Sequence, residues 1–178
     1  MYNSLISLKM GTAKQRQAYS AIENLGIMKD LVEYDPVVCG TIPIGVDVID
    51  SDLDIIMEVD HLHKLRFENK VKKLYENEID FKITRKNIRN LEVIKANFIF
   101  HGFEFEIFGQ SQPVLQQYAY QHMVIERFIL KEFPGIREQV INLKIKGYKT
   151  EPAFCEILGL SGDSYEALLN FGREKGII

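Results

Sequence analysis

The chain has 178 residues, 46% of them apolar, and a formal net charge of −3. This size suits one domain with a sizeable core, and the acidic balance argues against a nucleic-acid coat protein, because counterion release requires a strongly basic surface. Since no stretch approaches the roughly 18 consecutive apolar residues of a membrane span, and the start lacks the features of a secretory leader, we expect a cytoplasmic protein without a membrane anchor.

The first half of the chain predicts alternating helices and strands. Gly26 follows a run of good helix formers and is a suitable C-cap, whereas Asp35-Pro36 breaks the next helix. Short apolar runs predict buried strands, and a turn-rich loop at 42–51 connects two of them. Helices are expected at 13–25, 27–33 and 64–78, and buried strands at 37–39 and 54–59.

The second half predicts three more strands and then helices only. His101-Gly102 is a two-residue connection ending in glycine, which is typical of a β-hairpin. Strands are expected at 79–84, 91–100 and 103–108, and helices at 114–133, 136–146, 150–158 and from about 161 to 172. The fold class is therefore α+β, with a mixed sheet flanked by helices and a C-terminal helical bundle.

We expect residues 1–112 to form the α/β core and residues 113–178 a helical region packed on it as one compact unit. Apolar residues of the last third, among them Phe154, Leu158 and Leu168, either cover the sheet or form a homodimer.

The most informative stretch runs from Gly40 to Asp54. Asp52 and Asp54 are one residue apart at the start of a strand, so their side chains point to the same face and their charges repel. Such a pair is tolerated where a cation lies between the carboxylates, and hard oxygen ligands suit Mg²⁺ or Mn²⁺ shared with phosphates. Upstream, Gly40-Thr41 follows an apolar strand, where a glycine permits close approach of the backbone to a phosphate.

This stretch resembles the signature of the DNA polymerase beta-like nucleotidyltransferase superfamily, in which Gly-Ser follows a strand and Ser-Asp-x-Asp comes later. Gly45, Ser51 and the two aspartates fall at the spacing of its minimal members, and Thr41 replaces the usual serine. The resemblance implies a nucleotidyltransferase fold, metal binding by the aspartates, and triphosphate contacts from Gly40, Thr41 and Ser51. The chain is also similar to the uncharacterised bacterial family DUF4269, through 40–56 and 106–110, which brings no established activity.

The superfamily resemblance also implies a third carboxylate from a later strand. Glu104 and Glu106 alternate with apolar residues, so both lie on one face of the strand at 103–108. We favour Glu106, which is nearer the end of the strand, although the superfamily more often has aspartate there. In the family mechanism this residue is a metal ligand that helps to activate the acceptor hydroxyl.

Three further residues are candidate contacts for phosphates or the acceptor. Arg16 is near the start of the first helix, where a solvated helix face is the alternative interpretation. Tyr118 and His122 share a helical stripe with Glu126, which could hold the acceptor. A polar helix surface, or a core histidine with satisfied hydrogen bonds, is the alternative for that stripe.

The sequence thus predicts a metal-dependent transferase that moves a nucleoside monophosphate, with AMP from ATP favoured, to a hydroxyl of a small molecule or a protein. A nucleic acid is the least expected acceptor, because the chain is acidic. One alternative is a non-catalytic nucleotide-binding module of a toxin–antitoxin or regulatory pair. Another is an unrelated α+β protein with structural aspartates. Nucleotide binding without release of pyrophosphate would favour the non-catalytic module.

Overall fold

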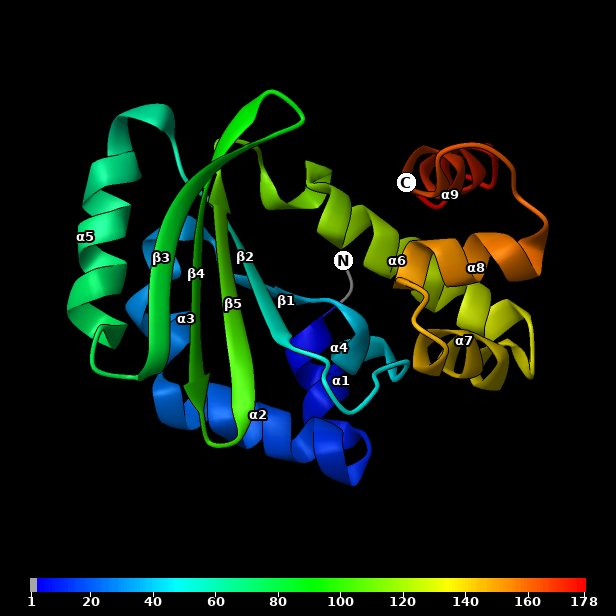
Figure 1. The fold of residues 1–178 in the computed structure, drawn as a ribbon, viewed down its shortest axis with the longest axis horizontal. Helices are drawn as coiled ribbons and strands as arrows, with labels where there is room; N and C mark the ends of the chain where they lie inside the picture. Colours follow the sequence, from blue (N-terminus) through cyan, green and yellow to red (C-terminus); the bar gives the residue numbers. More distant parts are fainter. Residues whose placement is uncertain (1–2) are drawn as a thin grey trace.

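The computed structural model describes residues 3–178, and its centre is one five-stranded mixed sheet (Figure 1). The strands, in their order across the sheet, are β1 (Val37–Cys39), β2 (Leu53–Glu58), β5 (Phe103–Gln110), β4 (Leu91–Phe100) and β3 (Ile79–Ile88). β2 and β5 are parallel, and the other neighbouring pairs are antiparallel. The predicted α+β class with a mixed sheet is confirmed.

Helices cover both faces of this sheet, because successive residues of the central strands point in opposite directions. Ile55 belongs to one hydrophobic core and Ile56 to the other. The core around Ile55 is closed by α1 (Ser4–Met10), α2 (Ala13–Leu25), α3 (Ile27–Asp30) and α5 (Lys64–Tyr75). The core around Ile56 is closed by α6 (Tyr118–Glu132), α7 (Ile136–Ile145), α8 (Thr150–Leu158) and α9 (Ser164–Glu174).

Several predicted boundaries differ from the structure. The helix expected at 114–133 is interrupted: 3₁₀ helix η3 (Val114–Gln116) is followed by Gln117 in an extended conformation, and α6 begins after it. The Gln117 side chain explains the break, because its Nε2 donates hydrogen bonds to the carbonyl oxygens of Met57 at 3.0 Å and Gln112 at 2.8 Å. The short helix α4 (Thr41–Ile44) overlaps the loop expected at 42–51. Two further 3₁₀ helices are η1 (Val32–Tyr34) and η2 (His61–His63).

Two tight hairpins fix the register of β3, β4 and β5. The predicted turn at His101-Gly102 is present, with Phe100 paired to Phe103. β3 extends beyond its predicted end at 84 to Ile88, because a second two-residue turn at Arg89-Asn90, with φ of 51° and 65°, continues the ladder. Among residues 3–178, no helix is long and apolar enough to span a membrane.

The β3–β4 turn contacts the C-terminal helices. Arg89 forms an ion pair with Glu166 of α9 at 2.7 Å, and its guanidinium lies 4.3 Å from the ring centroid of Tyr118 at the start of α6. The Tyr118 hydroxyl donates to the same Glu166 oxygen at 2.7 Å. This group of Arg89, Tyr118 and Glu166, which we call the Arg89 bracket, joins the β3–β4 turn to α6 and α9.

Candidate metal and nucleotide site

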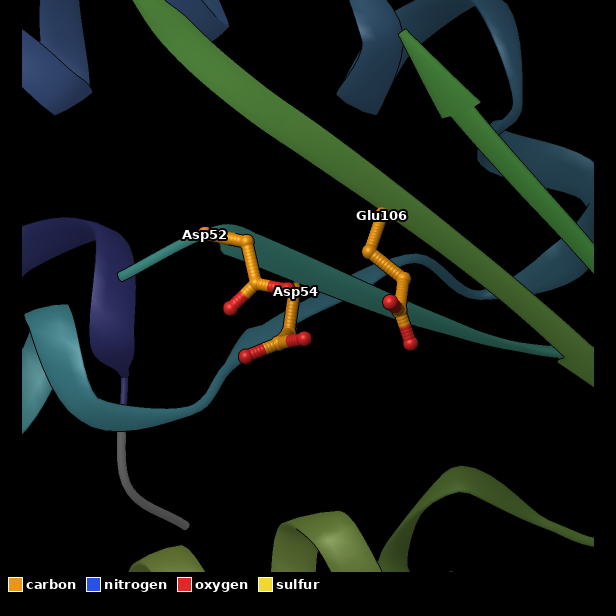
Figure 2. A group of neighbouring side chains, drawn as sticks. All are labelled: Asp52, Asp54 and Glu106. Atoms are coloured by element: carbon orange, nitrogen blue, oxygen red, sulfur yellow. The ribbon is translucent and has the colours of Figure 1, made fainter. Parts of the chain in front are cut away.

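Three carboxylates meet on the face of the sheet that is turned toward α6 (Figure 2). Asp54 of β2 is directly opposite Glu106 of the parallel strand β5, and Asp52 immediately precedes β2. Leu53, between the two aspartates, is fully buried in the other direction. One oxygen from each of the three carboxylates lies within 4.8 Å of the others. Glu104, the alternative third carboxylate, is not part of this group.

The backbone of Gly40 lies against Asp54. Gly40 has φ of 81°, and a Cβ atom built on it would be 2.0 Å from Oδ2 of Asp54. Its neighbour Cys39 pairs with Asp54 across the β1–β2 ladder, which explains the proximity. Glycine is required here for two reasons, the left-handed conformation and the space taken by the carboxylate.

Burial makes the charged form of these carboxylates costly. The pKa of Asp54 is raised well above its ordinary value, first by burial and then by the negative charges of Asp52 and Glu106. The pKa of Asp52 is also raised, mainly by burial, with further contributions from Glu106 and Glu104. Lys95 lowers both pKa values but does not cancel the effect. A divalent cation among the three oxygens would reverse this penalty, so the donor set fits one.

Two residues of β4 support Glu106, and neither was singled out from the sequence. Lys95 forms an ion pair with Oε2 of Glu106, and the Asn97 amide donates to the same oxygen at 3.4 Å and to Glu104 at 3.2 Å. A signal for Asn97 did exist: counting back from the predicted His101-Gly102 turn places Asn97 opposite Glu106, as the ladder shows.

The predicted triphosphate contacts lie beside the triad. Gly40 immediately precedes α4 and Thr41 is its first residue, and the Thr41 hydroxyl donates to Oγ of Ser51 at 3.3 Å. Ser51 Oγ also accepts the backbone N–H of Val48 at 2.9 Å. These bonds hold the loop that carries Asp52 against α4, so Gly40, Thr41 and Ser51 form a single wall next to the two aspartates.

The other predicted contacts have different surroundings. Arg16 donates to the Gly11 carbonyl oxygen at 2.5 Å and lines an open groove of about 1030 Å³ that also borders Ser51 and Glu104. His122 is only 3% exposed; its Nε2 lies 3.0 Å from the Tyr165 carbonyl oxygen, and its Nδ1 lies 3.4 Å from Glu151. His122 therefore matches the alternative interpretation, a core histidine, and Tyr118 belongs to the Arg89 bracket.

Lys144 of α7 is a cation near the site that the sequence pattern did not indicate. Its Nζ donates to the Val46 carbonyl oxygen at 2.9 Å. Burial lowers its pKa, whereas the surrounding carboxylates, Asp52 and Glu126 among them, act in the opposite direction. A half-buried ammonium group at this place brings positive charge from the helices toward the loop before Asp52.

Comparison with known proteins supports the same fold. The family model described as Domain of unknown function (DUF4269) matches residues 20–171. No curated protein matches. One similar solved structure is the MgGTP-bound Cid1 poly(U) polymerase, with 14% sequence identity and a TM-score of 0.54 over 72% of this chain and 41% of that chain. A second is the polymerase core of TRAMP, an RNA surveillance complex, with 13% identity and a TM-score of 0.54 over 92% of this chain and 50% of that chain. A third is the GLD-2/RNP-8 complex, with 14% identity and a TM-score of 0.54 over 85% of this chain and 60% of that chain.

These polymerases belong to the nucleotidyltransferase superfamily, and at such low identity the likeness shows the fold alone. The chain spans between 41% and 60% of the length of those three proteins.

Proposed function

We propose, since the chain belongs to the DUF4269 family and has the fold of nucleotidyltransferases, that it transfers a nucleoside monophosphate from a nucleoside triphosphate to a hydroxyl group. The observation that carries the proposal is the meeting of three carboxylate oxygens within 4.8 Å, beside a glycine-containing turn. Neither a structural strand end nor a solvated acidic patch requires Asp54 to be buried next to two like charges.

In this reaction the acceptor oxygen forms a bond to the α-phosphorus, and the bond from that phosphorus to the bridging oxygen breaks. Pyrophosphate leaves with the bonding electrons, and Glu106 takes the proton of the acceptor hydroxyl. Lys95 and Asn97, both on β4, fix the position of the Glu106 carboxylate. The wall made by Gly40, Thr41 and Ser51 offers backbone N–H groups and hydroxyls to the triphosphate.

Asp52, Asp54 and Glu106 would hold the divalent cation, Mg²⁺ or Mn²⁺. When bound, such a cation neutralises phosphate charge and lowers the pKa of an acceptor hydroxyl. Lys144 supplies further positive charge from α7, and we expect it to stabilise the triphosphate or the departing pyrophosphate.

ATP is the donor that we propose, and a small molecule or a protein side chain is the acceptor that the net charge of −3 favours. A net charge, however, averages over the whole surface and does not describe the charges next to Glu106. The identity of the acceptor therefore has to be judged from the residues around the triad.

Two measurements test the transfer. Calorimetry of the wild type with ATP and Mg²⁺ should show binding, and a coupled assay should show release of pyrophosphate when a hydroxyl acceptor is added. Asp54→Asn, which keeps the shape of the side chain, should abolish the release, whereas Asp35→Asn, in a turn away from the triad, should not. ATP binding without release of pyrophosphate in the presence of any acceptor would instead support the non-catalytic module.

A further inference from the structure

The site face of the sheet, which we define as the face carrying Asp54 and Glu106, continues across β4 to the edge strand β3. Residues that pair directly across a ladder point to the same side. Glu106 pairs with Asn97, and Asn97 pairs with Lys82 of β3. Because side chains alternate along a strand, Thr84 and Lys86 share this side. All three β3 side chains are exposed, so none of the helices in residues 3–178 covers this end of the site face.

Cations on the two sides of β3 differ in their partners. On the opposite side, Arg85 forms an ion pair with Glu68 of α5 at 2.8 Å. On the site face, the side chains of Lys82 and Lys86 form no hydrogen bond or ion pair with any residue in the described range 3–178. The protein therefore leaves two lysine side chains without an ion-pair partner on the side that carries the triad, although the chain as a whole is acidic.

These lysines lie on the opposite side of the triad from the wall formed by Gly40, Thr41 and Ser51. Gly40 and Thr41 lie beside β1 and β2, whereas Lys82 and Lys86 lie at the other end of the strand order, with the triad between them. In-line displacement needs the attacking and departing oxygens on opposite sides of the phosphorus. A triphosphate on the β1 side leaves the β3 side for the acceptor.

We propose that Lys82 and Lys86 bind the phosphodiester backbone of a single-stranded nucleic acid whose terminal hydroxyl is the acceptor of the transferred nucleotide. This inference rests on the proposed function. Adjacent strands are about 4.8 Å apart, so the backbone of Lys82 is about 10 Å from that of Glu106, and Lys86 is about 13 Å further along β3. Such a strip is too long for one phosphate group but matches successive phosphates of a strand that leaves the triad.

Lysines on an edge strand also discourage edge-to-edge aggregation, and they do so on either face of the strand. The two explanations differ in an experiment. Edge protection predicts that reversing these charges alters self-association only, whereas the proposal predicts a loss of affinity for nucleic acid.

The test is fluorescence anisotropy with a labelled single-stranded RNA of about 12 nucleotides, with Mg²⁺ and without nucleotide, at several salt concentrations. The double variant Lys82→Glu/Lys86→Glu should bind at least tenfold more weakly than the wild type, and the slope of log K against log salt should become about 1.4 less negative. Lys29→Glu/Lys73→Glu, exposed lysines on α3 and α5 with the same change in net charge, is the matched control and should bind like the wild type.

Equal affinities of the two double variants would overturn the inference. Loss of affinity in Lys82→Glu but not in Lys86→Glu would also overturn it, because a single phosphate contact does not need the length of the strip. The two double variants should both retain calorimetric binding of ATP and Mg²⁺, since neither changes the triad or the wall formed by Gly40, Thr41 and Ser51.

The same oligonucleotide separates this inference from the proposed transfer. If RNA binds through Lys82 and Lys86 but is never extended with ATP, and no other acceptor causes ATP to release pyrophosphate, the binding surface stands and the proposed transfer is overturned. If a small hydroxylated acceptor causes release of pyrophosphate and the wild type does not bind RNA, the proposed transfer stands and the inference of a nucleic-acid acceptor is overturned.

Discussion

Gly40 and Asp54 are packed so closely that the residue at position 40 decides where the carboxylate at position 54 can be. A methyl group at position 40 would be 2.0 Å from Oδ2 of Asp54, a distance that no Cβ contact tolerates. Gly40 immediately follows β1 and Asp54 lies on the neighbouring strand β2, and the antiparallel pairing of Cys39 with Asp54 holds the two residues together.

We therefore expect Gly40→Ala to damage the site as well as the fold. The backbone conformation at position 40, with φ of 81° and ψ of −160°, is essentially restricted to glycine and should alone cost about 1–3 kcal/mol of stability. Moving Asp54 should weaken Mg²⁺ binding by at least tenfold. Calorimetric titration of Mg²⁺ and denaturant unfolding measure the two effects. Gly147→Ala is the control: Gly147 has φ of 95° with nothing within 4 Å, so this variant should lose stability and bind Mg²⁺ normally.

Replacing Lys95 should reveal the repulsion among the carboxylates. In Lys95→Met, Glu106 loses its ion pair, and the metal-free protein should lose about 1–3 kcal/mol of stability. Saturating Mg²⁺ should stabilise this variant more than the wild type, because the added cation replaces the missing ammonium. Thermal unfolding with and without Mg²⁺ checks this.

Lys14→Met is the matched control, since Lys14 forms a comparable ion pair with Asp47 at 2.9 Å that does not include the triad. It should lose stability while its response to Mg²⁺ equals that of the wild type. An identical response in both variants would show that Lys95 does not influence the site.

Glu126 should make the stability of the protein depend on pH. Its pKa in the folded protein lies well above the ordinary value of 4.5, because burial and the nearby Glu151 disfavour the charged form, while Lys144 acts in the opposite direction. The folded state then binds a proton more tightly than the unfolded state. The free energy of unfolding should therefore fall as the pH rises from about 4.5 through the raised pKa, by up to about 1.4 kcal/mol per pH unit.

Glu126→Gln removes the titrating group and should flatten this fall, so that the variant gains on the wild type as the pH approaches neutrality. Urea unfolding at a series of pH values is the measurement. Glu132→Gln, an exposed glutamate on the same helix, should leave the pH profile unchanged. A profile in Glu126→Gln that runs parallel to the wild type would contradict the prediction.

Breaking the Arg89 bracket should loosen two distant segments together. Arg89→Ala removes the ion pair with Glu166 and the contact with the Tyr118 ring, at a global cost of about 1 kcal/mol because the ion pair is exposed. Hydrogen exchange should accelerate both in the β3–β4 turn and in α9. Arg85→Ala breaks an exposed ion pair with α5 in the same hairpin and should accelerate neither α9 nor α6.

The sequence predicted the strands and the alternation that bring the acidic residues to one face. Asp52 and Asp54 flank Leu53, and alternation along an extended chain is enough to place them on the same side. The two-residue turn at His101-Gly102 was recognisable from its glycine, and it fixes which β4 residue is opposite Glu106. These inferences need only local geometry.

What escaped prediction depends on contacts between distant segments. Nothing local indicates that Lys95 reaches Glu106 or that His122 is enclosed by Tyr165 and Glu151. Helix α4 was missed because its four residues contain Pro43 and are flanked by glycines, a composition that usually indicates a loop. The division of the chain at residue 112 stays a prediction.

The parallel pairing of β2 with β5 has a kinetic consequence. Asp54 and Glu106 come from strands that are joined through α5 and the whole β3–β4 hairpin, so among the strand pairs of residues 3–178 their pairing closes the longest loop, and we expect it to form late in folding. A cation that bridges them stabilises the native state but has little to bind in the folding transition state. Mg²⁺ should consequently lengthen the lifetime of the folded protein by slowing its unfolding, while leaving the rate of refolding nearly the same.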